Sequence, residues 1–496
     1  MRWLFFVLLF FGTRVDAKAQ GSSLLTQRFS CDTVRFLIDD ITRELSVKHP
    51  GFYRYTSKQN FDHFIDSVKN TVTDSLTLRE IYLKVKPVIA NIRCLHTGFS
   101  FPETYINELN EKTTVFPFQV YFIDEKALVI KNFSSDTSIR AGDEITQING
   151  EEINSIVSRI FPLMCTDGNG LAMKYRYLYF WFPSFYRHLQ PVDKYTITTK
   201  REGAQTDHDV KGVKAKDIAQ NGFLTEPVRD KQLEFTVENN VGILTIRSFA
   251  KSDIKKAGQS FKKFIDRTFA TLHKQNIRNL IVDIRDNTGG TDANAAYFTR
   301  HFFDSSFRYW DRIEVTKAIS DEIKGFFRVF FKKPVYKDST WLWRKGKLTR
   351  EFDFYQKQTP AKNNYKGKTY VLINGYCMSS CSDVAAVLSD QKKGIFIGEE
   401  TGGCYQGNNS GMIPTISLPP FGFRLSVPLQ KYTNHVDPDK NIGRGTIPKH
   451  VVKPTVEDLL NGNDRALHFA FSLIRDNSLD FASDTVLPKL AADTKQ

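Results

Sequence analysis

Cysteine is scarce in this chain, whose 496 residues include 6 Cys, 5 Met and 5 Trp. Small secreted modules that depend on disulfides carry cysteine at far higher density, so a disulfide scaffold is excluded. Cys377 and Cys381 are spaced CxxxC, and no His cluster joins them, which argues against a zinc site there. After residue 20 no apolar stretch approaches the roughly 20 residues that span a bilayer, so we expect no integral membrane segment in the mature chain.

No run of five or more Lys and Arg occurs either, although the chain is basic, with 69 Lys and Arg against 55 Asp and Glu. Scattered charges of this kind usually form a solvated surface, and we therefore expect no nucleic acid partner. The chain is 41% hydrophobic and 25% charged, and its 41 Phe are ample material for globular cores. The length suggests about three domains.

The N-terminus has the pattern of a secretory signal peptide. A short basic start precedes an apolar run over residues 4–11, and an Ala-x-Ala site ends at Ala19. The apolar run is too short to cross a membrane, and the order of basic, apolar and small residues is typical of a cleaved signal. We expect residues 1–19 to be removed and the mature chain, starting at Gln20, to be exported to a periplasm or beyond. An uncleaved anchor is the alternative.

Helical spacing of apolar residues dominates the next segment. The pattern occurs over residues 32–47, 59–70 and 77–92. We predict that residues 20–110 form an N-terminal helical domain.

Residues 111–205 have a pattern typical of β-structure. Apolar runs at residues 115–122 and 127–130 read as strands, and Gly142-Asp143, a short strand and Asn149-Gly150 follow them. This Gly-Asp turn, strand and Asn-Gly turn resemble the signature of a PDZ domain. The resemblance implies a PDZ-like β domain over residues 111–205.

From residue 236 strands alternate with helices, a pattern that favours a layered α/β core over residues 236–475. A polar linker over residues 206–235 is expected to precede this core, and a polar tail over residues 476–496 to follow it. An irregular insertion or lid is expected at residues 305–367. The predicted elements are strands at residues 241–246, 279–284, 369–373 and 394–398, and helices at residues 252–275, at 293–303 and from 382.

Three polar motifs follow predicted strands of the core. They occupy residues 283–290, 374–383 and 398–403. Ligand sites in open α/β sheets lie beyond the carboxyl ends of the strands, which is where these motifs stand. Taken alone, the first two motifs are better explained as a tight turn and a helix cap, and only the combination points to chemistry.

In combination the motifs resemble the C-terminal processing (tail-specific) serine peptidase family, including its tricorn-like branch. The Asp-x-Arg-x-Asn-x-Gly-Gly strand end of the family is matched at residues 283–290, its Asn-Gly…Ser-Ala-Ser-Glu segment at residues 374–383, and its Gly-Glu-x-Thr-x-Gly loop at residues 398–403. The order of helical domain, PDZ-like domain and core also agrees. The resemblance implies a multidomain α/β protein with an α/β-layered, crotonase-like peptidase core.

By this resemblance Ser380 is the nucleophile. It also implies that the backbone N–H groups of Cys381 and of Gly289 or Gly290 form the oxyanion hole, in which N–H donors stabilise the charge of the tetrahedral intermediate.

The resemblance also suggests a general base. The bacterial tail-specific branch uses a Lys just after the Gly-Glu-x-Thr loop, but residues 403–406 here are Gly-Cys-Tyr-Gln. The tricorn-like branch uses a His before the PDZ-like domain, where this chain has His96. Family members commonly read Asp-Gly-His-Thr at that point, whereas the first two residues here are Cys94 and Leu95. We expect His96 to be the base and note that a nearby carboxylate is lost.

In the tricorn-like branch a carboxylate beyond the Gly-Glu-x-Thr loop orients the His, directly or through a second hydroxyl. Asp437 and Asp439 lie in the corresponding region, and Asp439 is favoured for the role. A simple turn is the alternative for both.

These features predict an exported serine endopeptidase that acts on proteins or peptides and uses neither a metal nor another cofactor. A binding protein for a peptide or an apolar ligand on the same scaffold is one alternative. An esterase or amidase is another, since the chemistry of acyl transfer is shared.

Overall fold

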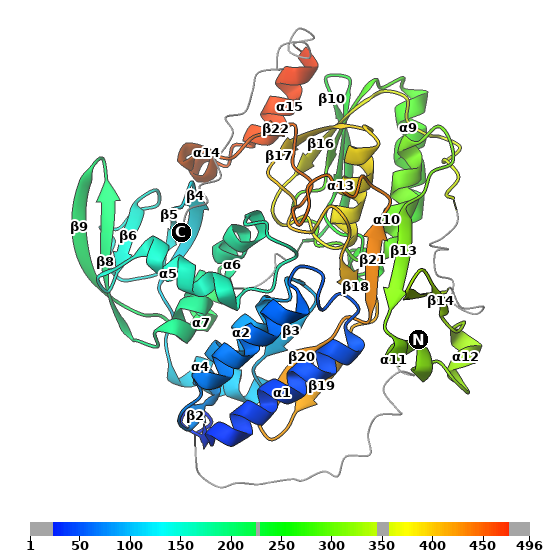
Figure 1. Cartoon of the computed structure of the whole chain (residues 1–496). Coiled ribbons are helices and arrows are strands. Elements are labelled where there is room, and N and C mark those ends of the chain that lie inside the picture. The colour runs from blue at the N-terminus through cyan, green and yellow to red at the C-terminus, as the bar shows by residue number, and fades with distance from the viewer. Residues whose placement is uncertain (1–22, 225–228, 345–356, 476–496) are drawn as a thin grey trace, which may run out of the picture.

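The computed structural model describes residues 23–224, 229–344 and 357–475 (Figure 1). The expected signal peptide over residues 1–19 and the expected tail over residues 476–496 lie outside the described residues. Within the described ranges, no helix is both long enough and apolar enough to cross a membrane.

Three helices dominate the N-terminal segment: α1 (Cys31–Lys48), α2 (Lys58–Asn70) and α3 (Leu78–Ala90). They confirm the three helices predicted from apolar spacing. Each follows a Ser or Thr whose side chain accepts a hydrogen bond from the first turn, as helix N-caps do. A fourth helix, α4 (Glu103–Lys112), follows, and β1 (Arg28–Phe29) pairs with β2 (Leu76–Thr77).

A distant part of the chain completes the core of these helices. β19 (Thr415–Leu418) and β20 (Phe423–Ser426) form a sheet with β3 (Gly98–Ser100), and their apolar residues are buried in the same cluster as α1–α3. In Figure 1 these orange strands lie against the blue helices. Because β3 begins just after His96, this sheet anchors the segment of the expected base.

A second sheet has the order β4-β5-β6-β8-β9, with β7 paired to β6. Helices α5 and α6 contribute to its hydrophobic core. The elements are β4 (Phe118–Ile123), β5 (Lys126–Asn132), β6 (Glu144–Ile148), β7 (Glu151–Glu152), α5 (Ile153–Ile160), α6 (Ala172–Leu189), β8 (Lys194–Arg201) and β9 (Ala204–Lys211).

One expectation for this region needs correction, and one helix was not expected. The linker expected over residues 206–235 is wrong at its start, because β9 pairs along its whole length with β8. This strand is mostly exposed and buries only Val210, so it lacks the alternating apolar pattern of a half-buried strand. Helix α6 is not predicted either, because its apolar residues face two clusters, one under the sheet and one at the core loops, and so follow no single stripe.

The central sheet has the order β10-β11-β12-β16-β17-β22. All neighbours from β11 to β22 are parallel, and β10 runs antiparallel at one edge. The four strands predicted for the core are confirmed as β11, β12, β16 and β17. The elements are β10 (Leu233–Glu238), β11 (Val241–Ile246), β12 (Asn279–Asp283), β16 (Lys368–Ile373), β17 (Ile395–Gly398) and β22 (His450–Val451).

Helices cover both faces of this sheet (Figure 1). α9 (Phe261–Lys274), α10 (Asp292–Thr299) and α13 (Ser380–Asp390) share a hydrophobic cluster with one face, and α15 (Arg465–Arg475) packs on the other. Burial on both faces explains why the strands read as continuous apolar runs. The single helix expected over residues 252–275 is wrong: α8 (Lys251–Lys256) and α9 are separated at Gly258, which has a φ of +68°.

The segment expected to be irregular, residues 305–367, contributes to another sheet of order β14-β15-β13-β21-β18. The expectation is therefore wrong for residues 310–342. The elements are β13 (Trp310–Val315), α11 (Lys317–Glu322), α12 (Phe327–Phe330), β14 (Val335–Lys337), β15 (Thr340–Leu342), β18 (Asn409–Ser410) and β21 (Gln430–Asn434). Short helices α7 (Ala215–Ala219) and α14 (Val456–Asn461) complete this mixed α/β architecture, with 3-10 turns at Phe161–Leu163 and Arg300–Phe302.

Candidate active site

The three polar motifs lie at one edge of the central sheet. β12 ends at Asp283, β16 at Ile373 and β17 at Gly398, and β16 pairs in parallel with both of the other strands. The loops that follow therefore leave the sheet side by side, where open α/β sheets place their ligand sites.

Ser380 opens helix α13 and is buried, with 1% of its surface exposed. The turn before it is closed by a hydrogen bond of 3.0 Å from the Cys381 N–H to the Met378 carbonyl. Ser379 has φ +52° and ψ −132°, close to the second position of a type II′ turn, which favours Gly. Such strain in front of a helix is typical of turns that present a nucleophile. The Ser380 Oγ has no hydrogen-bond partner in the described part of the chain.

The carbonyl oxygen of Cys377 joins the second motif to the third. It accepts a hydrogen bond from the Ser382 hydroxyl at 2.9 Å and from the N–H groups of Gly402 at 2.9 Å and Gly403 at 3.1 Å. A Cβ on Gly403 would lie 2.2 Å from the Ser382 Oγ, so no side chain fits there. The glycines of the third motif therefore allow its loop to lie directly against the turn that precedes Ser380.

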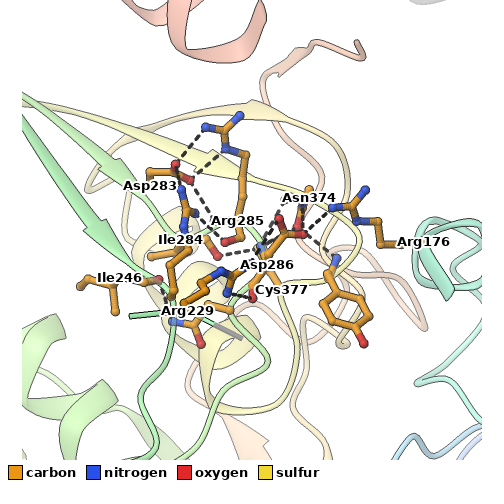
Figure 2. Close-up of polar contacts among 12 residues, drawn as sticks. Arg176, Arg229, Ile246, Asp283, Ile284, Arg285, Asp286, Asn374 and Cys377 are labelled. Carbon is orange, nitrogen blue, oxygen red and sulfur yellow. Dashed lines mark hydrogen bonds and ion pairs between the residues drawn. The ribbon is translucent and has the colours of Figure 1, made fainter. Parts of the chain in front are cut away.

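A polar network joins the first motif to the second (Figure 2). Asn374 Oδ1 accepts hydrogen bonds from the N–H groups of Asp286 (3.0 Å) and Tyr376 (3.1 Å), and Asn374 Nδ2 donates to Asp286 Oδ1 at 2.9 Å. Arg176 of α6 donates to the same carboxylate oxygen at 2.9 Å. Burial raises the pKa of Asp286, but the Arg176 charge and the Asn374 hydrogen bond outweigh burial and hold that pKa below its usual value.

Asp283 and Arg285 form a second network behind these loops, also drawn in Figure 2. Arg285 donates two hydrogen bonds of 2.9 Å to Asp283 and bonds of 2.8 and 2.6 Å to Asp464. Arg247 donates to Asp283 as well. Burial raises the pKa of Asp283, but the two arginines outweigh it and hold the pKa well below its usual range. These charged residues of the first motif thus stabilise the loop.

The expected oxyanion donors lie around the turn that precedes Ser380. A Cβ on Gly289 would lie 2.9 Å from the Ser380 nitrogen, so the two backbones are in close contact. The Cys381 N–H closes the turn to Met378, and the Gly289 N–H donates to Asn287 Oδ1 at 2.8 Å. Among the described residues no hydrogen bond from the Gly290 N–H is found.

His96 lies in the turn that precedes β3, and its ring is half-buried. Burial lowers the pKa of His96 to about 4, and a hydrogen bond to the backbone carbonyl of Asn409 opposes that shift. The ring is therefore neutral at pH 7, the form that accepts a proton. Its Nδ1 is buried and has no partner within the described ranges.

A neighbouring histidine supports this turn. His49 Nδ1 accepts a hydrogen bond from the Gly51 N–H at 3.1 Å, so its Nε2 carries the proton and donates to Thr97 Oγ1 at 3.0 Å. Burial lowers the pKa of His49 to about 3, so this ring also stays neutral.

Residues 403–409 connect His96 to the helix of Ser380. Asp383, in the first turn of α13, accepts hydrogen bonds of 3.2 Å from Asn408 Nδ2, and the next residue, Asn409, accepts from the His96 ring. Leu95 also packs against the cluster that contains Met378. Two consecutive residues, Asn408 and Asn409, thus contact the helix that begins at Ser380 and the His96 ring, respectively. Burial raises the pKa of Asp383 to about 7.

Asp167 is a site residue that the sequence analysis misses. Its Oδ1 accepts a hydrogen bond from the Leu95 N–H at 2.9 Å, which fixes it beside His96. Burial raises the pKa of Asp167 to about 6, while the Leu95 N–H and the Arg54 charge oppose the rise. No signal in the sequence marks this residue, which lies in a Thr-Asp-Gly turn far from the three motifs.

Asp439 lies on an exposed turn, where its N–H donates to Asp437 Oδ1 at 3.0 Å. In the described part of the chain no hydrogen bond joins Asp439 to His96. The role of Asp439 as the orienting carboxylate stays a prediction.

A cavity of about 570 Å³ lies beside these loops. One wall comes from the end of β4 and the start of α6, and the other from Gly375, Glu399 and Glu400. The cavity therefore separates the second sheet from the second and third motifs.

Comparisons with known proteins agree with this geometry. Residues 240–452 match the profile of Peptidase family S41. The fold is similar to that of mature CPAF, with a TM-score of 0.61 and 13% identity over 92% of this chain and 99% of that chain. It is equally similar to mature CPAF complexed with lactacystin, with a TM-score of 0.62 and 14% identity over 90% of this chain and 98% of that chain.

No curated protein sequence matches the chain. At such low identity the structural likeness concerns the fold, whereas the family match covers all three polar motifs. The chain is therefore a serine-type peptidase, and its residues 240–452 are similar to Peptidase family S41.

Proposed function

We propose that this chain is an exported serine endopeptidase in which Ser380 is the nucleophile and His96 the general base. One observation carries the proposal. The Ser380 Oγ and the His96 Nδ1 are both buried without a hydrogen-bond partner among the described residues, and their segments meet at residues 403–409. A buried polar atom without a partner calls for an explanation, and a catalytic role is one such explanation.

The chemistry follows from the neutral state of the ring. His96 takes the hydroxyl proton of Ser380 while the Oγ attacks the substrate carbonyl carbon. The protonated ring then gives its proton to the leaving amine, which leaves an acyl group on Ser380. A water molecule, deprotonated by the same ring, hydrolyses this acyl-enzyme and restores both residues.

The oxyanion of the tetrahedral intermediate needs backbone donors near Ser380. We assign one donor to the N–H of Gly290. The N–H of Cys381 is the second donor once substrate displaces the Met378 carbonyl from it. The amino end of α13 adds a favourable dipole for the negative charge.

The finer architecture belongs to the same proposal. Residues 111–205 are assigned as a PDZ-like module, which β9 extends to residue 211, and residues 236–475 as a crotonase-like layered core. A PDZ-like sheet recognises an extended peptide by strand addition. The 570 Å³ cavity beside β4 offers a passage from such a module to the loops of the core. Export rests on the signal-peptide pattern of residues 1–19.

Labelling with a fluorophosphonate tests the nucleophile. The wild-type chain should be labelled on Ser380, and Ser380→Ala should lose both labelling and peptide hydrolysis, the latter by about 10⁶-fold in turnover. Ser379→Ala is the matched control, because it removes the adjacent hydroxyl and leaves Ser380 in place. His96→Ala should slow labelling while the circular dichroism spectrum stays unchanged.

The outcomes separate the alternatives. A chain that is never labelled is a binding protein on this scaffold. A chain that is labelled on Ser380 and cleaves esters or small amides but no peptide is an esterase or amidase. Loss of labelling in Ser379→Ala with labelling retained in Ser380→Ala would contradict the assignment of the nucleophile.

A further inference from the structure

Three metal-ligating side chains lie together beside the proposed catalytic pair. The Sγ of Cys94, a ring nitrogen of His96 and a carboxylate oxygen of Asp167 all lie within 4.8 Å of one another. The two loops that carry them are held together by the Leu95 N–H, which donates to Asp167 Oδ1 at 2.9 Å. The cluster is therefore built by a backbone contact and does not depend on flexible surface side chains.

The donor groups of this cluster are buried, and two of them contain an atom without a hydrogen-bond partner. Cys94 is 0% and Asp167 is 3% exposed. Asp167 Oδ2 and His96 Nδ1 have no hydrogen-bond partner in the described ranges. The Cys94 Sγ contacts the Asn409 carbonyl at 3.7 Å and also forms hydrogen bonds with the Thr97 side chain and with the backbone of His96 and Thr97. Buried polar groups without partners are costly, and a cation held between them would remove that cost.

We propose that Cys94, His96 and Asp167 bind a zinc ion that inhibits the peptidase. Zinc takes sulfur, nitrogen and oxygen ligands in tetrahedral geometry, and three protein ligands with one open position are a common set. Zinc–ligand distances of about 2.0–2.3 Å place tetrahedral donors roughly 3.5 Å apart, so the cluster closes by about 1 Å around the ion. Cys94 binds as a thiolate and releases its proton to solvent.

The surrounding charge makes the site suited to reversible binding. Arg54 is buried near both Cys94 and Asp167. A divalent ion is neutralised by one thiolate and one carboxylate, and the Arg54 guanidinium then leaves the region with a net positive charge. This repulsion weakens binding relative to a structural zinc site of the same ligands.

Zinc inhibits the peptidase because His96 is both a zinc ligand and the proposed general base. This part of the inference rests on the proposed function. A ring nitrogen that binds zinc cannot accept the proton of Ser380, because the metal occupies its lone pair. Zinc therefore turns the base into a ligand without touching Ser380 itself.

Metal binding to the reduced full-length chain tests the site without relying on activity. Zn²⁺ is titrated against a chromophoric chelator, and Co²⁺ serves as a second probe, because a thiolate ligand gives it a charge-transfer band. Cys94→Ser removes the sulfur, and Asp167→Asn removes the charge while keeping an acceptor for the Leu95 N–H. Cys165→Ser, at a half-buried cysteine outside the cluster, is the matched control.

We expect about one Zn²⁺ per chain, and about tenfold or weaker binding in each of Cys94→Ser and Asp167→Asn. The Co²⁺ thiolate band should vanish in Cys94→Ser and persist in Cys165→Ser. Saturating Zn²⁺ should slow fluorophosphonate labelling of the wild type about tenfold or more, and EDTA should restore it.

The site is disproved if the chain binds no zinc, or if both cluster variants bind it like the wild type. Zinc binding by a chain that is never labelled would contradict the peptidase proposal and leave the metal site standing. Labelling of Ser380 in a chain that binds no zinc would support the peptidase proposal and disprove the metal site.

Discussion

Replacing Asp286 by Asn tests whether the polar network of Figure 2 holds residues 374–383, the segment of Ser380, in place. Asp286 Oδ1 accepts hydrogen bonds of 2.9 Å from both Arg176 and Asn374, and Asp286 Oδ2 lies 3.8 Å from an Arg229 nitrogen. Asn has the same shape and tolerates the φ of +56° at this position, so the change removes charge without adding backbone strain.

The expected cost follows from the geometry. Two unit charges about 4 Å apart attract by roughly 4 kcal/mol at an effective dielectric constant of 20. The side chains of Arg176 and Asp286 are 17% and 23% exposed, so solvent screens part of this attraction. The amide also keeps one acceptor for Arg176. We therefore expect Asp286→Asn to lower the free energy of unfolding by about 2–3 kcal/mol and to slow labelling of Ser380.

Urea unfolding at several pH values is the assay. The folded pKa of Asp286 is lowered, so its charge stabilises the fold above the unfolded pKa of about 4, and this contribution is lost as pH falls further. The difference between wild type and variant should thus be full at pH 7 and shrink below pH 4. Asp321→Asn, in the exposed Lys317–Asp321 pair, is the matched control and should leave the midpoint unchanged. An Asp286→Asn midpoint equal to that of the control would refute the reasoning.

Three further predictions concern other parts of the chain. Ser379→Gly should keep fluorophosphonate labelling at the wild-type rate and leave the midpoint of urea unfolding equal or higher. The reason is that Gly relieves a backbone strain of about 1 kcal/mol at the positive φ of this position. A lower midpoint would contradict this prediction. The pKa of Asp383 is raised to about 7, so its ionisation should lower wild-type stability between pH 4 and 7 by at most roughly 4 kcal/mol. Asp383→Asn should remove this contribution in urea unfolding and make the slope shallower. Mass spectrometry of the exported protein should find Gln20 at the N-terminus; an intact Met1 would indicate an uncleaved anchor.

The sheet and its site motifs could be predicted because local signals and topology agree there. β12 and β16 are nearly continuous apolar runs, and polar motifs follow each of them directly. Adjacent parallel strands bring such motifs together without further information. Placing residues 283–290 and 374–383 at strand ends therefore needed only the strand assignment, and in the structure Asn374 joins the two.

The elements that could not be predicted are those whose pattern depends on distant partners. Helix α6 buries two faces, one under the second sheet and one at the core loops, so no stripe marks it. β9 is an exposed edge strand with a single buried side chain. β19 and β20 complete a core formed mostly by residues before position 110, a pairing that no local signal predicts.

The proposed base, His96, is likewise positioned by distant partners that no local sequence signal reveals. His96 is placed by Asn409 and by β3, and both contacts depend on residues more than 300 positions away. The tail-specific peptidases that the chain resembles commonly have Asp two residues before this histidine, whereas this chain has Cys94. Asp167, from another loop, provides a carboxylate beside His96. A neutral ring with an unpartnered nitrogen can accept a proton, and beside a thiol and a carboxylate it can also bind a metal. Cys94 therefore supplies the sulfur ligand of the proposed zinc site next to the proposed base.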